Sequence, residues 1–159
     1  MPNALSLRLL AVLAAVVTIG LASIACADAD AATEVGDDAP VAVCDDLEAI
    51  QATVSFADDV QMVFDFNCVA CHQTGAANAG LNLEFGLAYE QLVEVDSSQS
   101  ELPLVARGDP NGSYLMHKLW GTQAEVGGSG GIMPLGLGGL PEREIETVAT
   151  WILECALEN

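Results

Sequence analysis

The pattern of apolar and polar residues predicts a helix at 55–67. Ser55 and Asp58 match a capping box, in which a serine hydroxyl and an acidic side chain bind free backbone N–H groups of the first turn. Apolar residues then recur at spacings of three or four, as expected for the buried face of a helix. This face consists of Phe56, Val60, Val63 and Phe64.

Further helices are predicted at 85–95, from Asp109-Pro110 to Gly121, and from Pro141 towards the end of the sequence. Asp as a cap followed by Pro is a preferred helix start, and Gly is a preferred stop. The sequence therefore predicts an all-α fold. The inward-facing residues of the first of these helices are expected to be Leu87, Leu92 and Val95 or their neighbours. Those of the other two are expected to be Tyr114, Leu115, Leu119, Ile145, Val148, Ala149, Ile152 and Ala156.

The N-terminus carries the features of an export signal. Arg8 precedes an almost wholly apolar run at 9–21, and Ala25-Cys26-Ala27 offers the small-x-small pattern of a cleavage site. A signal peptide at 1–27 is expected, with a lipoprotein signal that makes Cys26 the acylated first residue as the alternative. An uncleaved anchor is less favoured, because the run is shorter than the roughly 20 apolar residues of a comfortable span. Each of these routes predicts a periplasmic or cell-surface protein.

Composition divides the rest of the chain into three parts. Residues 28–40 are mainly Ala, Asp, Glu and Gly, so they predict a flexible acidic linker. Residues 41–54 form an N-terminal extension whose main feature is Cys44, and residues 55–159 form the functional domain.

The chain is strongly acidic, with a formal net charge of −19. Beyond the signal segment its basic residues are Arg107, Lys118 and Arg143. This balance argues against nucleic acid and anionic membrane surfaces as partners, so membrane association is expected only through Cys26 or an uncleaved anchor. The acidity suits a partner protein with a basic face, and it equally suits a surface adapted to a salty medium.

The most specific motif is Cys68-Val69-Ala70-Cys71-His72. C-x-x-C-H is the attachment pattern for haem c, in which two cysteines hold the porphyrin covalently and the histidine binds the iron. A zinc site would need two more ligands at similar spacing, and a dithiol redox site would need a preceding strand. The sequence therefore predicts one covalent haem c per chain, with His72 as an axial ligand.

Met133 is the expected second axial ligand. It stands before Pro134 in a glycine-rich loop that precedes the last helix, where a thioether can face the distal side of a haem. A methionine that fills a gap in the core is the alternative. Met62 and His117 are weaker ligand candidates, since the first is expected in the core and the second at a hydrogen-bonded or surface position.

Two cysteines remain once Cys26 and the motif are set aside. Cys44 and Cys155 are expected to form a disulfide in an oxidising compartment, and two separate buried thiols are the alternative. The bridge would close a loop of about 110 residues, worth up to roughly 4–5 kcal/mol in the chain-entropy model.

The order of these features resembles the class I cytochrome c fold, a small helical bundle around one covalently bound haem c. Within that class it is similar to the planctomycete-type bacterial cytochrome c domains, over about 55–157. The resemblance implies attachment by Cys68 and Cys71, proximal ligation by His72 and distal ligation by Met133. The matching residues are Phe56, Val60, Phe64, Asn67 to His72, Gly108, Asp109, Pro110, Ser113, Leu115, Lys118, Gly121, Met133, Pro134, Leu140, Glu144, Ile145, Trp151 and Ile152.

The function expected from these features is one-electron transfer rather than enzymatic catalysis. His/Met ligation closes the iron to substrates, so the iron changes only its valence. Arg107 and Lys118 are candidates to bind the haem propionates, because the domain has only one other cation. Two alternatives stay open. Met133 could be labile and admit small ligands or peroxide, or the domain could be a haem subunit docked on a larger respiratory complex.

Overall fold

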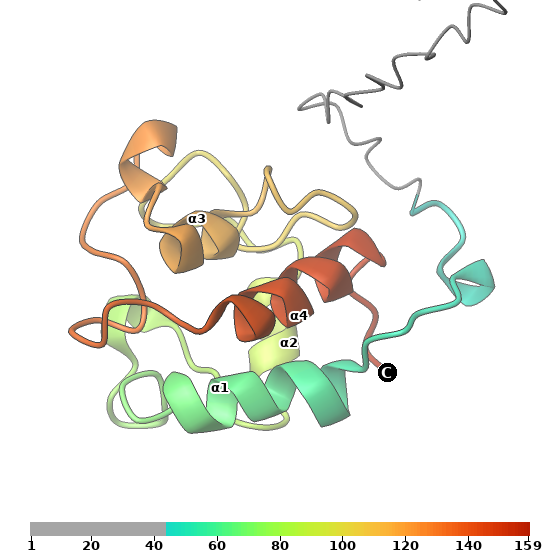
Figure 1. Ribbon diagram of the computed structural model, residues 1–159, viewed down its shortest axis with the longest axis horizontal. Coiled ribbons are helices and arrows are strands. Elements are labelled where there is room, and N and C mark those ends of the chain that lie inside the picture. Colours follow the sequence, from blue (N-terminus) through green and yellow to red (C-terminus); the bar gives the residue numbers. More distant parts are fainter. Residues whose placement is uncertain (1–43) are drawn as a thin grey trace, which may run out of the picture. The chain divides into compact units, whose positions relative to one another are not determined.

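The computed structural model describes residues 44–159, and every regular element in this part of the chain is a helix (Figure 1). Extended pairing within it is limited to isolated bridges, such as the one between Val93 and Val105. The all-α prediction is therefore confirmed for the described residues. In chain order the elements are η1 Leu47–Ala49, η2 Phe56–Val60, α1 Gln61–Asn67, η3 Asn78–Gly80, α2 Ala88–Leu92, α3 Tyr114–Trp120, η4 Gln123–Val126 and α4 Glu142–Leu153.

The predicted signal peptide, the acylation site at Cys26 and the acidic linker at 28–40 lie outside the described residues. The predicted extension at 41–54 is described from Cys44 onwards. No helix within 44–159 is long and apolar enough to cross a membrane.

The first helix begins at Ser55 as predicted, but its first turn differs from a capping box. The Ser55 hydroxyl accepts a hydrogen bond from the Asp58 amide at 3.2 Å. The reciprocal bond, however, runs from the Ser55 amide to Asp59 Oδ2 at 2.8 Å. The reason is that η2 is a π-helical turn, which inserts an extra residue and brings the fourth rather than the third residue back under the cap. Asp59 therefore takes the role predicted for Asp58.

The helix predicted from Asp109-Pro110 starts later than expected. Asp109 Oδ1 accepts a hydrogen bond from the Gly112 amide at 2.8 Å, so these residues form a side-chain-capped turn. Ser113 is the N-terminal cap position of α3, which Gly121 ends with a left-handed φ of 81°. The predicted end of this helix at Gly121 is confirmed. The predicted start was wrong, because Asp109 caps a turn and not the helix.

The helix predicted at 85–95 is reduced to the short α2. Leu92 is buried there as predicted, and Leu87 is 42% exposed while its neighbour Ala88 is buried in its place. Val95 is half-buried beyond the helix end. The apolar spacing in this stretch thus overestimated the length of the helix.

An aromatic cluster joins the ends of the domain. The Trp151 ring of α4 lies 5.1 Å from that of Phe56 in η2, and Tyr89 of α2 lies 5.2 Å from Phe56 between ring centroids. The Trp151 indole is buried and donates to the Leu157 carbonyl at 2.9 Å. The structure thus places Trp151 on the turn that opens the first helix.

A disulfide between Cys44 and Cys155 fastens the N-terminal extension to the end of α4, as predicted. The two Cα atoms are 5.6 Å apart, at a sequence separation of 111. Beside it the Glu154 carboxylate accepts hydrogen bonds from the backbone amides of Thr53 and Val54 at 2.8 and 3.0 Å. The chain before the first helix is therefore held to the C-terminal turn at adjacent points.

Candidate functional site

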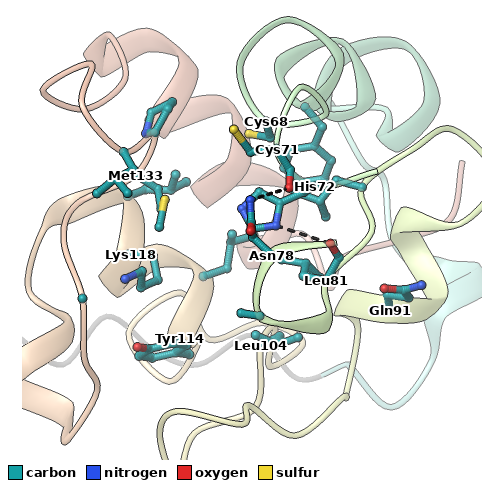
Figure 2. Close-up of a pocket in the computed structure, with 18 of the residues that line it drawn as sticks. Cys68, Cys71, His72, Asn78, Leu81, Gln91, Leu104, Tyr114, Lys118 and Met133 are labelled. Atoms are coloured by element: carbon teal, nitrogen blue, oxygen red, sulfur yellow. Dashed lines mark hydrogen bonds between the residues drawn. The ribbon is translucent and has the colours of Figure 1, made fainter. Parts of the chain in front are cut away.

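A largely apolar cavity of about 1020 Å³ opens between α1, α3 and the loops that follow α1 and precede α4. This volume slightly exceeds the roughly 300–1,000 Å³ that is typical of small-molecule and cofactor sites. Figure 2 shows Cys68, Cys71, His72 and Met133 around this space. The structure thus brings together the four residues that the sequence singled out most strongly.

Both motif cysteines line the cavity as free thiols. Cys68 follows the last residue of α1, and its amide donates to the Phe64 carbonyl at 2.8 Å, so the helix end fixes its position. Cys68 is half-buried and Cys71 is exposed. Burial, together with the nearby Glu144 carboxylate, raises the pKa of the Cys68 thiol to about 12. Cys68 is therefore a neutral thiol over the physiological pH range.

The imidazole of His72 is oriented by a backbone carbonyl. Its Nδ1 lies 3.3 Å from the Leu81 carbonyl oxygen (Figure 2). A carbonyl oxygen only accepts hydrogen bonds, so this contact places the proton on Nδ1 and leaves the lone pair of Nε2 for a metal ion. The His72 carbonyl in turn accepts from the Leu83 amide at 2.8 Å, which holds the segment 81–83 beside the motif.

Asn78 closes the loop that follows the motif. Its side-chain amide donates to the Cys71 carbonyl at 2.9 Å, and its backbone amide approaches the same oxygen at 3.3 Å. Neither Asn78 nor the Leu81 carbonyl was predicted as part of the site. An asparagine within a small-residue loop was the available signal for the first, whereas a backbone carbonyl leaves no signal in the sequence.

The Met133 loop is attached to α3 by hydrogen bonds. The Met133 amide donates to the Lys118 carbonyl at 2.8 Å, and Lys118 Nζ donates to the Ser129 carbonyl at 3.0 Å. Gln123 Nε2 donates to the Gly130 carbonyl at 2.9 Å, and the Ser129 amide donates to the Tyr114 hydroxyl at 3.3 Å. These bonds hold the half of the glycine-rich loop that precedes Met133. Tyr114 and Gln123 were not predicted to have this role.

Lys118 lines the cavity, but Arg107 does not. Lys118 is 9% exposed, and burial lowers the pKa of its ammonium group below the usual lysine range. The Arg107 guanidinium donates instead to the carbonyls of Cys155 and Ala156 at 2.7 and 2.8 Å. Arg107 and Lys118, which were both predicted to bind the haem propionates, therefore lie at different sites, because Arg107 donates hydrogen bonds to carbonyl groups of the C-terminal turn.

The weaker ligand candidates lie away from the cavity lining. Met62 was expected in the core, but its side chain is 55% exposed on α1. His117 has both ring nitrogens in hydrogen-bonding contact, Nδ1 with the Thr122 hydroxyl at 2.8 Å and Nε2 with the Asn111 carbonyl at 2.9 Å. His117 is thus hydrogen-bonded, as predicted.

Within residues 44–159, no group of three or more His, Cys, Asp or Glu side chains is placed to hold a metal ion. His72 and Met133 instead offer one nitrogen and one sulfur donor to the same cavity. These two residues would be able to hold an iron whose other ligands come from a macrocycle.

No family model and no curated protein matches the chain. Among solved structures, Kuenenia stuttgartiensis hydrazine synthase is similar, with 22% sequence identity and a TM-score of 0.45. The match covers 65% of this chain and 16% of the other, so the chain spans less than one sixth of that protein's length.

Proposed function

We propose that this protein is an exported mono-haem c-type cytochrome of the class I fold that carries single electrons. The observation that supports this most directly is the convergence of Cys68, Cys71, His72 and Met133 on one large apolar cavity. Haem c bound there would supply an iron that alternates between two valence states.

The residues present fit such a group in three respects. Free thiols at Cys68 and Cys71 are available to form the two thioether bonds. The Leu81 carbonyl fixes the His72 tautomer that has a free Nε2 lone pair. The cavity volume and its apolar lining suit a porphyrin, while Lys118 offers an ammonium group for a propionate.

The hydrogen bonds that hold the Met133 loop support electron transfer over ligand binding. A labile methionine requires a loop that can leave the cavity, and the segment 129–133 is bonded to Lys118, Gln123 and Tyr114. Ligation by both His72 and Met133 would leave the iron no site for a substrate, and it would raise the reduction potential relative to two histidines.

Export and partners belong to the same proposal. Haem attachment through cysteines and a disulfide between Cys44 and Cys155 both suit an oxidising, non-cytoplasmic compartment. The net charge of −19 favours a redox partner with a basic face and disfavours nucleic acid.

The proposal is tested by producing the full chain in a host that attaches haem c and recording its spectra after denaturing gel electrophoresis and acid–acetone extraction. Wild-type protein is expected to keep its haem through both treatments. Cys68→Ala/Cys71→Ala is expected to release it, because neither thioether bond can form. Wild-type protein without covalent haem would contradict the proposal.

A matched control uses the other cysteine pair. Cys44→Ser/Cys155→Ser removes the same number of sulfur atoms at a site away from the cavity lining. This variant is expected to retain covalent haem, and a photometric redox titration of it should show one reversible one-electron step.

A further inference from the structure

Asn111 and Gly112 form a reactive dipeptide in the turn that precedes α3, and they are the one Asn-Gly pair in the sequence. In such a pair the glycine amide nitrogen can attack the side-chain carbonyl of the asparagine. Because glycine has no Cβ, it hinders this attack less than any other residue. Asn111 is exposed, and its side chain has no hydrogen-bond partner among residues 44–159. No hydrogen bond in this part of the chain therefore holds the side chain away from the Gly112 nitrogen.

A carboxylate lies beside the attacking nitrogen. The Gly112 amide donates a hydrogen bond to Asp109 Oδ1 at 2.8 Å. This distance is within the roughly 2.6–3.2 Å at which a general base can take a proton. The contact depends on glycine at position 112, because a Cβ there would collide with the Asp109 carboxylate.

An imidazole lies beside the carbonyl oxygen of the same peptide bond. His117 Nε2 is 2.9 Å from the Asn111 backbone oxygen, and His117 Nδ1 is 2.8 Å from the Thr122 hydroxyl. A carbonyl oxygen only accepts hydrogen bonds, so this contact places a proton on Nε2. When the Gly112 nitrogen loses its proton, negative charge spreads onto the Asn111 oxygen. A donor within about 2.7–3.1 Å of such an oxygen is placed to stabilise that charge.

From this arrangement we propose that Asp109 and His117 promote the self-modification of Asn111 through a succinimide. Asp109 takes the amide proton of Gly112 while the bond from the Gly112 nitrogen to Asn111 Cγ forms. The bond between Cγ and Nδ2 then breaks, and the proton passes to the leaving nitrogen, which departs as ammonia. Water opens the ring to aspartate or isoaspartate, and no atom is oxidised or reduced.

Both products change the segment that leads into α3. Each adds a carboxylate close to that of Asp109, and isoaspartate also adds a methylene group to the backbone. α3 carries Tyr114 and Lys118, which bond the loop before Met133. The modification therefore occurs next to the helix that holds this loop. The inference does not rest on the proposed function, because no atom of a haem takes part in the step.

The test follows the conversion of Asn111 in full-length protein by peptide mapping with mass spectrometry, in neutral buffer at constant temperature. The reference is the same chain unfolded in guanidinium chloride. Folded protein is expected to convert at least about tenfold faster than the unfolded chain, because a positioned acid or base contributes roughly 10²–10⁴-fold. Folded protein that converts no faster than the unfolded chain would overturn the inference.

Two variants separate the roles of the two side chains. Asp109→Asn keeps an oxygen that can accept from Gly112 but removes the base, and His117→Phe removes the donor. Each is expected to slow the folded protein at least about tenfold and to leave the rate of the unfolded chain unchanged. Folded variants that convert as fast as wild type would contradict these roles.

Asp58→Asn, at an exposed position on η2, is the matched control and is expected to convert at the wild-type rate. Circular dichroism establishes that each variant is folded. If Asp109→Asn does not fold, His117→Phe and the comparison of folded with unfolded wild type still decide the outcome.

Discussion

The backbone amide of Met133 donates a hydrogen bond of 2.8 Å to the backbone carbonyl of Lys118. The Lys118 side chain reaches the Ser129 carbonyl at 3.0 Å, so one residue of α3 holds the loop at two points. The first bond involves only main-chain atoms and survives a change of either side chain. The position of the loop and the chemistry of the Met133 thioether can therefore be varied separately.

Met133→Ala is expected to lower the reduction potential and to abolish the far-red charge-transfer band of a Met–ferric iron bond, because it removes the sulfur donor. The loop should stay in place through its main-chain bond. Since Met133 is only half-buried, the loss of stability should stay below the ~2 kcal/mol lower bound for truncating a buried methionine. Redox titration and urea unfolding measure the two effects. An unchanged potential and band would contradict Met133 as a ligand.

Lys118→Gln is expected to lower the reduction potential by less than the about 59 mV that changes a one-electron equilibrium tenfold. The reason is that a cation near the iron stabilises the reduced state, and its loss leaves a propionate unpaired. The measurement is a redox titration at constant pH. A potential equal to that of wild type would contradict the role of Lys118 at the propionate.

Arg107→Gln is expected to change the stability of the domain and not its reduction potential. It serves as the matched control for Lys118→Gln. Its guanidinium bonds the carbonyls of Cys155 and Ala156, and it donates to the Tyr89 hydroxyl at 2.8 Å. Hydrogen bonds to charged groups are worth about 1.5–3 kcal/mol each. Arg107 is half-buried, so part of this amount is expected as a loss of unfolding free energy. The reduction potential should stay at the wild-type value, which separates a structural cation from one at the haem.

The disulfide is expected to stabilise the domain without affecting the haem site. Cys44→Ser/Cys155→Ser should lower the unfolding free energy by up to about 4–5 kcal/mol, because the bridge closes a long loop in the unfolded chain. Urea unfolding monitored by tryptophan fluorescence measures the loss. In denatured wild type without reductant, reactive thiols from this pair would contradict the bridge.

Glu84 makes the stability of the loop after the Cys68–His72 motif dependent on pH. Hydrogen bonds from the Thr74 side chain and amide, and from Asn82, lower the pKa of its carboxyl. A lowered folded-state pKa stabilises the protein above the usual glutamate value of about 4.3, and this stabilisation is lost as the pH falls through the folded-state value. The difference in Tm between wild type and Glu84→Gln should therefore be largest near neutral pH and become smaller in acid.

Glu146→Gln, at an exposed position on α4, is the control for Glu84→Gln. Its Tm difference from wild type is expected to be small at every pH. If the Glu84→Gln difference were equally large in acid and at neutral pH, the carboxylate would not be the group that stabilises this loop.

The local features of the fold were predictable where a short-range rule acts alone. The cap at Ser55, the stop at Gly121 and the apolar spacing of the last helix follow from backbone hydrogen bonding within a few residues. Prediction from the sequence failed where the same residues can form either of two local structures. Asp109 capped a turn instead of a helix, and a π-turn shifted the capping role from Asp58 to Asp59.

The sequence by itself determined the identities of the chemical groups: two cysteines and a histidine at fixed spacing, a methionine before a proline, and a second cysteine pair. Only the tertiary structure decided which groups share a cavity. It placed Lys118 beside Met133 and moved Arg107 to the C-terminal turn, although both are cations of the same domain. The physical reason is that spacing along the chain fixes contacts within one helical turn, whereas contacts between distant segments depend on how the helices pack and which carbonyl groups need donors.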